Sequence, residues 1–257
     1  MLNESHYIRR LRADDVRELN RSPGTPILAM LQETALLISG QPNLEGPIES
    51  YVRALLPSVE LWTQHRKWKP SWSCRVSQNQ DTYAPGEKID ALSLHSDMSR
   101  FHEPPAIVMI YCIRPDPHSL YGGANIVMRA DEILSRLAED GHAALQRMLT
   151  ARRPLNCDDR CGMTASIMAW GDEPVRMFDI SAATNGDHLV LTEPERLAYR
   201  QVQELCMSWT DLHGTVRLAP GELLVVSNRR WLHGRTRCGG PGRTTQILLA
   251  DPTLAFD

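Results

Sequence analysis

Apolar residues recur at helical spacing in the N-terminal third of the chain. Residues 12–19 form a short amphipathic pattern, and a broader apolar face follows between Thr25 and Gly40. Thr25 and Pro26 suit the first positions of a helix, and Gly40 suits the left-handed residue that ends one. Helices are therefore predicted over residues 12–19, 25–40 and 48–56. We expect these helices to brace a sheet from outside.

From about residue 73 the pattern changes to short apolar runs with turn residues between them, such as Pro85-Gly86. Strands are predicted over residues 74–80, 90–97, 106–113, 125–128, 166–170, 175–180, 215–218, 222–226 and 244–249. Many short strands separated by turns are typical of a jelly roll or barrel. The fold class predicted from the pattern is therefore mainly β with flanking helices.

Two helical inserts interrupt the predicted strands. One is expected over residues 131–149, with a break at Asp140-Gly141. The other follows Thr192, which forms a capping-box pattern with Glu195. The apolar face of this second helix should contain Leu197, Val202, Leu205 and Cys206. We expect one domain over residues 1–257, with a helical N-terminal brace (1–72) and a core (73–251) that carries inserts near 131–149 and 192–212.

The composition and charge of the chain limit the classes of partner and location that we expect for it. Hydrophobic residues make up 42% of the 257 residues, which is enough for a substantial core. The formal net charge of -3 gives no reason to expect nucleic acid or an anionic membrane as a partner. No apolar run approaches the roughly 20 residues of a membrane helix, and the N-terminus has no apolar signal region. A cytoplasmic protein with a small-molecule substrate is expected, and homo-oligomerisation is left open.

His95 and Asp97 are the first candidate ligands of a metal ion. They lie two residues apart in the predicted strand 90–97, so their side chains share one face. A third ligand must come from elsewhere, and His233 is the best candidate. Two histidines and one carboxylate on one side of a metal form the ligand set of non-heme Fe(II) oxygenases. The alternative is that a His-x-Asp sequence arises by chance and that His233 is an ordinary surface or core histidine.

Arg243 opens the last predicted strand. Alternation along that strand places Arg243, Thr245 and Ile247 on one face. Burying the charge of an arginine inside a barrel costs free energy unless the arginine pairs with an anion. Its planar guanidinium can bind a carboxylate through two hydrogen bonds. A barrel with two histidines, one aspartate and an inward arginine therefore indicates a metal and a carboxylate-bearing co-substrate. The alternative is an exposed arginine on an edge strand.

The chain resembles the Fe(II)/2-oxoglutarate-dependent dioxygenases of the TauD/TfdA (clavaminate synthase-like) superfamily. The matching pieces occur in the order and with separations similar to those of the family, within about residues 73–251. They are His95-Ser96-Asp97, Pro104-Pro105-Ala106, Gly122-Gly123, and residues 227–235 followed by Arg243. The combination is far more specific than any single piece.

The resemblance implies a core with the double-stranded β-helix (jelly roll, cupin-like) fold. It implies that His95, Asp97 and His233 are the iron ligands and the catalytic residues. Arg243 would pair with the distal carboxylate of 2-oxoglutarate, helped by Thr245 and by Asn125, which stands where the family often has Thr or Ser. An asparagine amide can still donate a hydrogen bond to that carboxylate. The implied cofactors are Fe(II), 2-oxoglutarate and O₂, with ascorbate added in vitro.

Two positions bear on the reaction and the substrate. Related halogenases have Gly or Ala in place of the carboxylate ligand, so the intact Asp97 favours hydroxylation over halogenation. Some members use a second arginine after the one that pairs with 2-oxoglutarate, and here that position is Ile247. This departure puts a taurine-like sulfonate substrate in doubt.

The candidate substrate residues come from three segments. Ser99 and Arg100 follow the His-x-Asp motif in a turn that should cover the iron, and a solvated Arg100 is the alternative. Gln78 and Gln80 lie on the preceding strand, and Arg235 follows His233 as a substrate or supporting residue. The predicted function is hydroxylation of an unactivated C–H of a small polar metabolite, with release of succinate and CO₂. The substrate expected from the resemblance is an amino acid or an amino-acid-derived natural-product intermediate of secondary metabolism.

Two other functions are left open. The same cofactors could support desaturation, cyclisation or epoxidation, because the pose of the substrate decides the outcome. A function of a different class is a non-catalytic ligand-binding jelly roll. The four residues His95, Asp97, His233 and Arg243 argue against it, since a binding module has no need of all four.

Overall fold

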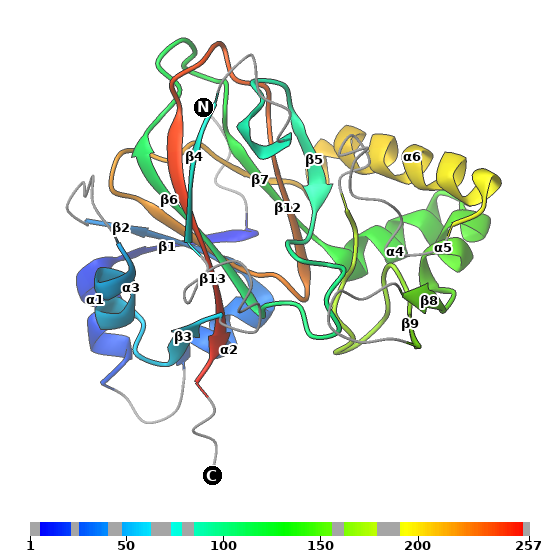
Figure 1. Cartoon of the computed structure of the whole chain (residues 1–257), viewed down its shortest axis with the longest axis horizontal. Coiled ribbons are helices and arrows are strands. Elements are labelled where there is room, and N and C mark those ends of the chain that lie inside the picture. The colour runs from blue at the N-terminus through cyan, green and yellow to red at the C-terminus, as the bar shows by residue number, and fades with distance from the viewer. Residues whose placement is uncertain are drawn as a thin grey trace.

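The protein contains two main β-sheets that pack face to face in the centre of the molecule (Figure 1). The computed structural model describes residues 6–21, 26–40, 48–62, 73–78, 85–155, 162–178 and 191–253, and the structural statements below concern these residues. The first sheet has the order β1 (Ile8–Arg12), β2 (Ala35–Ser39), β11 (Leu223–Ser227), β6 (Ile107–Arg114), β13 (Thr244–Pro252) and β3 (Val59–Leu61). The strand β4 (Ser73–Ser77) also pairs with β13.

The second sheet has the order β10 (Gly214–Val216), β7 (Asn125–Arg129), β12 (Trp231–Arg235) and β5 (Leu92–His95). A separate hairpin joins β8 (Arg153–Leu155) and β9 (Met163–Ala165). Among these strands only β1 and β2 pair in parallel, and the remaining described pairs are antiparallel. The two packed antiparallel sheets confirm the predicted jelly-roll core.

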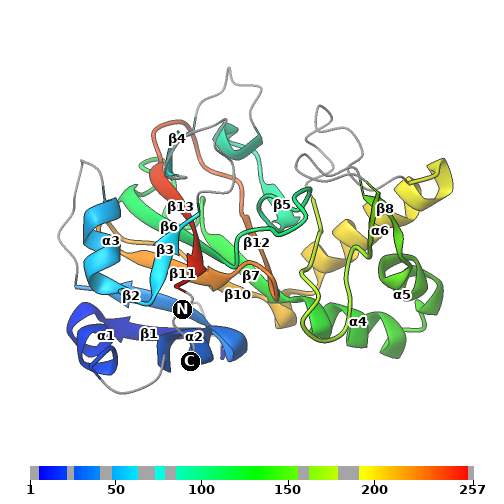
Figure 2. The same cartoon turned by 60° about the horizontal axis from the view of Figure 1, so that its bottom comes forward.

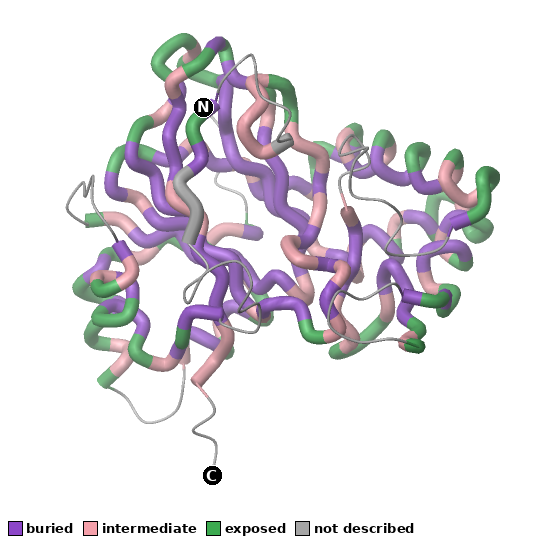
Figure 3. Tube along the Cα trace, in the orientation of Figure 1, coloured by how far each residue is buried: buried purple, intermediate pink, exposed green. Residues whose placement is uncertain are grey.

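Apolar side chains form three layers around these sheets. The layer between the sheets includes Val108 of β6, Leu224 of β11 and Val127 of β7. A second layer packs the outer face of the first sheet against α1 (Ala13–Leu19), α2 (Pro26–Glu33) and α3 (Glu49–Leu55). A third packs the outer face of the second sheet against α4 (Ala130–Glu139), α5 (Ala143–Thr150) and α6 (Glu193–Ser208). Figure 2 shows the two helical groups on opposite sides, and Figure 3 shows the buried strands between them.

Several predicted elements are confirmed. The helices near residues 12–19 and 48–56 are present as α1 and α3, and they brace the first sheet as expected. The helical insert breaks between α4 and α5, where Gly141 adopts a φ of 80°. The helix α6 begins after the capping box of Thr192 and Glu195. Two 3₁₀ turns, Pro85–Glu87 and Thr210–Leu212, complete the described helical elements.

The predicted helix over residues 25–40 is wrong in its second half. The helix α2 ends at Glu33, and β2 follows between β1 and β11. The strand is buried on both faces and therefore reads as an unbroken apolar run, which periodicity cannot distinguish from a helix. Gly40, with a φ of 78°, follows this strand rather than a helix, and Thr25 lies outside the described residues. The segment 1–72 thus supplies strands as well as helices.

Other predictions near the hairpin are also wrong. Residues 166–170 contain bends, and residues 175–178 form no regular strand. The last two residues of the predicted strand 175–180 lie outside the described residues. Leu197 is 56% exposed instead of contributing to the buried face of α6. The strands β1, β8, β9 and β12 were not predicted from the pattern.

No helix in the described part of the chain has the length and apolarity needed to span a bilayer.

Candidate active site

A cavity of about 320 Å³ lies between the two sheets. Its wall includes side chains from β5, β7 and β12 of the second sheet, from β6 and β13 of the first, and from the turn after β5. The candidate site residues that line it are Gln78, His95, Asp97, Ser99, Arg100, Asn125, His233, Arg235, Arg243 and Thr245. Gln80 lies outside the described residues. The predicted inward face of Arg243, Thr245 and Ile247 is confirmed, because all three line this cavity.

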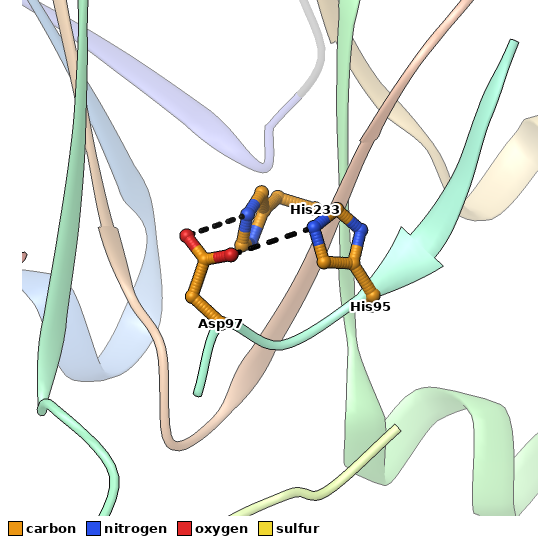
Figure 4. Close-up of side chains that lie close together, drawn as sticks. All are labelled: His95, Asp97 and His233. Atoms are coloured by element: carbon orange, nitrogen blue, oxygen red, sulfur yellow. Dashed lines mark ion pairs between the residues drawn. The ribbon is translucent and has the colours of Figure 1, made fainter. Parts of the chain in front are cut away.

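His95, Asp97 and His233 form a cluster at one wall of the cavity (Figure 4). Antiparallel pairing of β5 with β12 places His95 directly opposite His233. Asp97 follows in the turn after β5, with its Oδ1 3.6 Å from His95 Nε2 and its Oδ2 3.4 Å from His233 Nε2. One ligand atom from each residue lies within 4.8 Å of the others. Two imidazole nitrogens and a carboxylate oxygen on one side suit a divalent transition metal.

The protonation states of the cluster fit a cation. His95 Nδ1 lies 2.8 Å from the carbonyl oxygen of Ser93, so a proton on Nδ1 leaves the Nε2 lone pair facing Asp97. Burial and the nearby His95 lower the pKa of His233, which favours the neutral imidazole. Burial raises the pKa of Asp97, but the interactions of its carboxylate with the two histidines, including a hydrogen bond from each, outweigh burial and hold this pKa below its ordinary value. Deprotonated donors of this kind are what metal binding requires.

Asn228 anchors the main chain of Asp97. This side chain is fully buried, its Oδ1 accepts a hydrogen bond from the Asp97 N–H at 2.8 Å, and its Nδ2 donates to the Asp97 carbonyl at 2.9 Å. The same Nδ2 donates to the carbonyl of Pro105 at 2.9 Å. Sequence reasoning included Asn228 in a motif without giving it a role. A buried asparagine that bonds to both the N–H and the carbonyl of Asp97 holds the main chain of this residue in place.

Arg243 and Asn125 form the polar end of the cavity. Arg243 is 5% exposed, and its guanidinium donates to Gln78 Oε1 at 3.4 Å and to Asn125 Oδ1 at 3.2 Å. No carboxylate of the described residues forms an ion pair with it. Burial, followed by the positive charge of Arg235, lowers the pKa of Arg243 to about 10. The buried Nδ2 of Asn125 also has no hydrogen-bond partner within the described ranges, so this end of the cavity can donate to an anion.

Arg235 lies in the same wall but its donors are occupied. Its guanidinium donates to the carbonyls of Lys88 at 2.6 Å and Asp90 at 3.0 Å and to Cys238 Sγ at 2.8 Å. These bonds tie the segment before β5 to the end of β12. The arrangement favours the supporting role that the sequence left open for Arg235 over direct contact with a substrate.

A family model described as "Taurine catabolism dioxygenase TauD, TfdA family" matches residues 14–249. The chain belongs to this family. It is an Fe(II)/2-oxoglutarate-dependent dioxygenase, as the resemblance implied, and Fe(II), 2-oxoglutarate and O₂ are its cofactor and co-substrates. A comparison with curated protein sequences gave no match.

Several solved structures share the fold of this TauD/TfdA-family chain. Asparagine oxygenase (AsnO) has a TM-score of 0.63 and 18% identity over 94% of this chain and 78% of its own. PvcB from Pseudomonas aeruginosa has a TM-score of 0.60 and 16% identity over 97% and 87% of the two chains. A taurine dioxygenase from Burkholderia xenovorans has a TM-score of 0.58 and 15% identity over 96% and 89%. At these identities the likeness concerns the fold.

The absence of a side chain at Gly123 leaves room for the side chain of Arg243 in this dioxygenase. Its φ is 67°, and a Cβ at this position would lie 2.9 Å from Arg243 Cδ and 3.2 Å from Cys238 Sγ. Replacing Gly123 by Ala should therefore displace Arg243 and weaken 2-oxoglutarate binding by about tenfold, the equivalent of about 1.4 kcal/mol. The measurement is a titration of 2-oxoglutarate into the metal-loaded protein under nitrogen.

The matched control for this substitution is Gly141→Ala. Gly141 has a φ of 80°, but a Cβ there would meet nothing within 4 Å. Both variants carry the strain of an alanine in the left-handed region, and only the Gly123 variant has the clash. Equal 2-oxoglutarate affinities in the two variants would contradict the role of Gly123.

Proposed function

We propose that this dioxygenase hydroxylates an unactivated C–H of a small polar metabolite, with release of succinate and CO₂. The proposed substrate is an amino acid or an amino-acid-derived intermediate. The observation that supports the proposal is that a single cavity is lined by the cluster of His95, Asp97 and His233 and also by Arg243, whose guanidinium can bind an anion. A site with these two parts can hold a metal and a dicarboxylate side by side.

The substrate class is supported by the similar structures. One is asparagine oxygenase in complex with Fe(II), 2S,3S-3-hydroxyasparagine and succinate. Another is the non-heme iron oxygenase OrfP in complex with (3S)-hydroxy-L-Arg. PvcB is described as an Fe, alpha-ketoglutarate dependent oxygenase from an isonitrile synthetic pathway. The first two of these relatives are bound to hydroxylated amino acids, which makes free amino acids the first compounds to test.

The residues divide into three groups in this proposal. His95 and His233 would hold the iron through Nε2, and Asp97 would hold it through a carboxylate oxygen. Bound Fe(II) would supply the redox chemistry that couples the decarboxylation of 2-oxoglutarate by O₂ to oxidation of the C–H bond. Arg243 binds the distal carboxylate of 2-oxoglutarate, with the amide of Asn125 and the hydroxyl of Thr245 completing the contacts.

The rest of the cavity orients the substrate and keeps water out. Ser99, Arg100 and Gln78 line its wall and can present a hydroxyl, a guanidinium and an amide to a polar substrate. Ile247 and Ile110 add apolar surface near Arg243, so no second arginine from β13 is available for a sulfonate. Holding the reacting C–H in a fixed pose is the main contribution of these side chains.

The test is a screen of free amino acids for stimulated succinate formation, with Fe(II), 2-oxoglutarate, O₂ and ascorbate. We expect at least one amino acid to raise the rate and to gain one oxygen atom from isotopically labelled O₂. A product that has lost two hydrogens instead would indicate desaturation or cyclisation. Stimulation by none of them would contradict the substrate class and point to a carrier-tethered or nucleoside-like substrate. Failure of the protein to bind Fe(II) and 2-oxoglutarate would favour the non-catalytic jelly roll.

A further inference from the structure

The turn that follows Asp97 has a strained backbone. Met98 adopts a φ of 55°, and it is the only residue other than glycine with a positive φ among those described. Residues 96–100 line the cavity, and Ser99 and Arg100 are the side chains proposed to meet the substrate. A left-handed residue other than glycine persists only where its surroundings hold it in place. The contacts of this turn should therefore include a strong anchor.

Arg176 supplies three hydrogen bonds to this turn. Its side chain is buried, with 4% of the residue exposed. Nη1 donates to the carbonyls of Ser99 at 2.7 Å and Phe101 at 2.5 Å, and Nη2 donates to the carbonyl of His102 at 2.8 Å. A planar guanidinium can reach several carbonyls at once in a fixed geometry, which a lysine ammonium on its flexible stem does less well. Arg176 thus holds residues 99–102 in place through three hydrogen bonds.

The segment that carries Arg176 is itself fixed at both ends. The Ser96 N–H donates to the carbonyl of Met177 at 2.8 Å, and the Ser96 hydroxyl donates to the carbonyl of Val175 at 2.9 Å. Farther along, the Phe178 N–H donates to the Tyr199 hydroxyl at 2.7 Å. The Phe178 ring, which also lines the cavity, stacks on the Tyr199 ring with centroids 4.6 Å apart. Because Tyr199 belongs to α6, the helical insert supports the turn through this segment.

Asn228 and Arg176 hold different parts of the same loop. Asn228 bonds to the main chain of Asp97, and Arg176 bonds to the carbonyls from Ser99 onward. The strained Met98 lies between the two anchors. Loss of one anchor should therefore loosen its own half of the loop and leave the other half in place.

We propose that Arg176 is a positioning residue for the substrate side of the active site, whereas Asn228 positions the metal side. Arg176 acts through the turn 98–102 and does not line the active-site cavity. It fixes Ser99 and Arg100, so that the substrate meets a preformed wall. This inference rests on the proposed function, since it assumes that the turn faces the substrate.

The test compares Arg176→Met with Arg153→Met. Arg153 is the control, because it is also buried and donates to the carbonyls of Met148 at 2.7 Å and Ala151 at 2.8 Å, away from the cavity. It also pairs with Glu195 at 2.5 Å, so its loss should destabilise the protein at least as much as the loss of Arg176. In the Arg176 variant, amide hydrogen exchange over residues 98–102 should speed up by about tenfold or more. The dissociation constants of Fe(II) and 2-oxoglutarate should stay within about threefold of the wild-type values, because their binding groups keep their anchors.

A third variant, Asn228→Ala, should show the opposite pattern, with Fe(II) affinity lowered by about tenfold to a hundredfold. With an amino acid substrate, Arg176→Met should raise KM and release more succinate per hydroxylated product. If Arg176→Met does not fold, Arg176→Lys replaces it, and we expect a smaller increase in exchange over the same residues.

The proposal is overturned if exchange over residues 98–102 is unchanged by the Arg176 substitutions, or if they weaken Fe(II) binding as much as Asn228→Ala does. Equal changes in the Arg153 control would also overturn it, because they would show a general loss of stability. Failure of the proposed function is distinguishable, because no amino acid would then stimulate succinate formation by the wild-type protein, whereas the comparisons of amide exchange and Fe(II) affinity need no substrate.

Discussion

Replacing Asp97 by alanine is expected to reduce Fe(II) affinity by more than about a hundredfold. This loss is larger than the one expected for a residue that only supports a metal ligand. Asp97 is the only carboxylate in the described metal cluster, and it lies between the two histidines. Without it, two neutral imidazoles face a divalent cation with no compensating charge. Succinate formation from 2-oxoglutarate should fall by about a thousandfold or more, equivalent to roughly 4 kcal/mol. Calorimetric titration of Fe(II) under nitrogen and a succinate assay measure the two effects.

Two further variants make this result specific. Asp97→Asn keeps the shape of the side chain and removes its charge, so a loss of Fe(II) binding there would be due to the charge. Asp251→Ala removes a carboxylate that accepts a hydrogen bond from the Ala106 N–H at 2.9 Å and does not line the active-site cavity. This control should lower thermal stability without lowering Fe(II) affinity. Wild-type metal affinity in Asp97→Ala would rule out Asp97 as a ligand.

The proposed metal and 2-oxoglutarate residues could be predicted from the sequence because the residue types themselves carry the chemistry. His95, Asp97 and His233 are the kinds of side chain that bind a transition metal, and the structure brings them together. The strand that carries His233 was not predicted. Within β12, His233 and Arg235 are buried polar residues, so the apolar alternation of an ordinary strand is broken. The local sequence of β12 does not have the pattern of a buried strand, although the fold buries it, because its polar residues line the active site.

The supporting roles of Asn228 and Arg176 could not be predicted from the sequence because their partners are remote along the chain. Asn228 bonds to a residue 131 positions away, and Arg176 bonds to carbonyls 74 to 77 positions away. An arginine between two apolar residues gives no local sign that it will be buried against three carbonyl groups. The strand β2 illustrates a different limit: Leu36 and Ile38 pack in the layer that contains the helices α1, α2 and α3, and Ala35 and Leu37 pack in the layer between the sheets. Both faces are therefore buried and apolar, which removes the alternation.

Replacing Arg243 by methionine is expected to weaken 2-oxoglutarate binding and to stabilise the protein without ligands. Loss of one partner of a buried charge pair costs about 2–5 kcal/mol, so the dissociation constant should rise by about 30- to 4000-fold. In the absence of ligand, two amide oxygens are the hydrogen-bond acceptors of the buried guanidinium among the described residues. Its pKa of about 10 shows that folding disfavours its charge, at a cost on the order of 3 kcal/mol. Methionine removes that cost and fills a similar volume.

The sign of the pH dependence follows from the same shift. Because the pKa of Arg243 is lower in the folded state, the cost is fully present below pH 10 and diminishes as the pH rises from about 10 toward 12.5. Thermal unfolding at neutral pH should therefore show a higher Tm for Arg243→Met than for the wild type. 2-Oxoglutarate at a hundred times the wild-type Kd should stabilise the metal-loaded wild type by about 2.7 kcal/mol and the variant by at most about 0.9 kcal/mol.

The control for Arg243 is Arg235→Met, in the same wall of the cavity. Arg235 donates to the carbonyls of Lys88 and Asp90 and to Cys238 Sγ, so its loss leaves buried acceptors unpaired. This variant should have a lower Tm than the wild type, opposite in sign to Arg243→Met. Its loss of 2-oxoglutarate affinity should be smaller, because its donors already have partners. A lowered Tm in both variants, together with unchanged 2-oxoglutarate affinity in Arg243→Met, would show that Arg243 is a structural residue and not the anchor of the co-substrate.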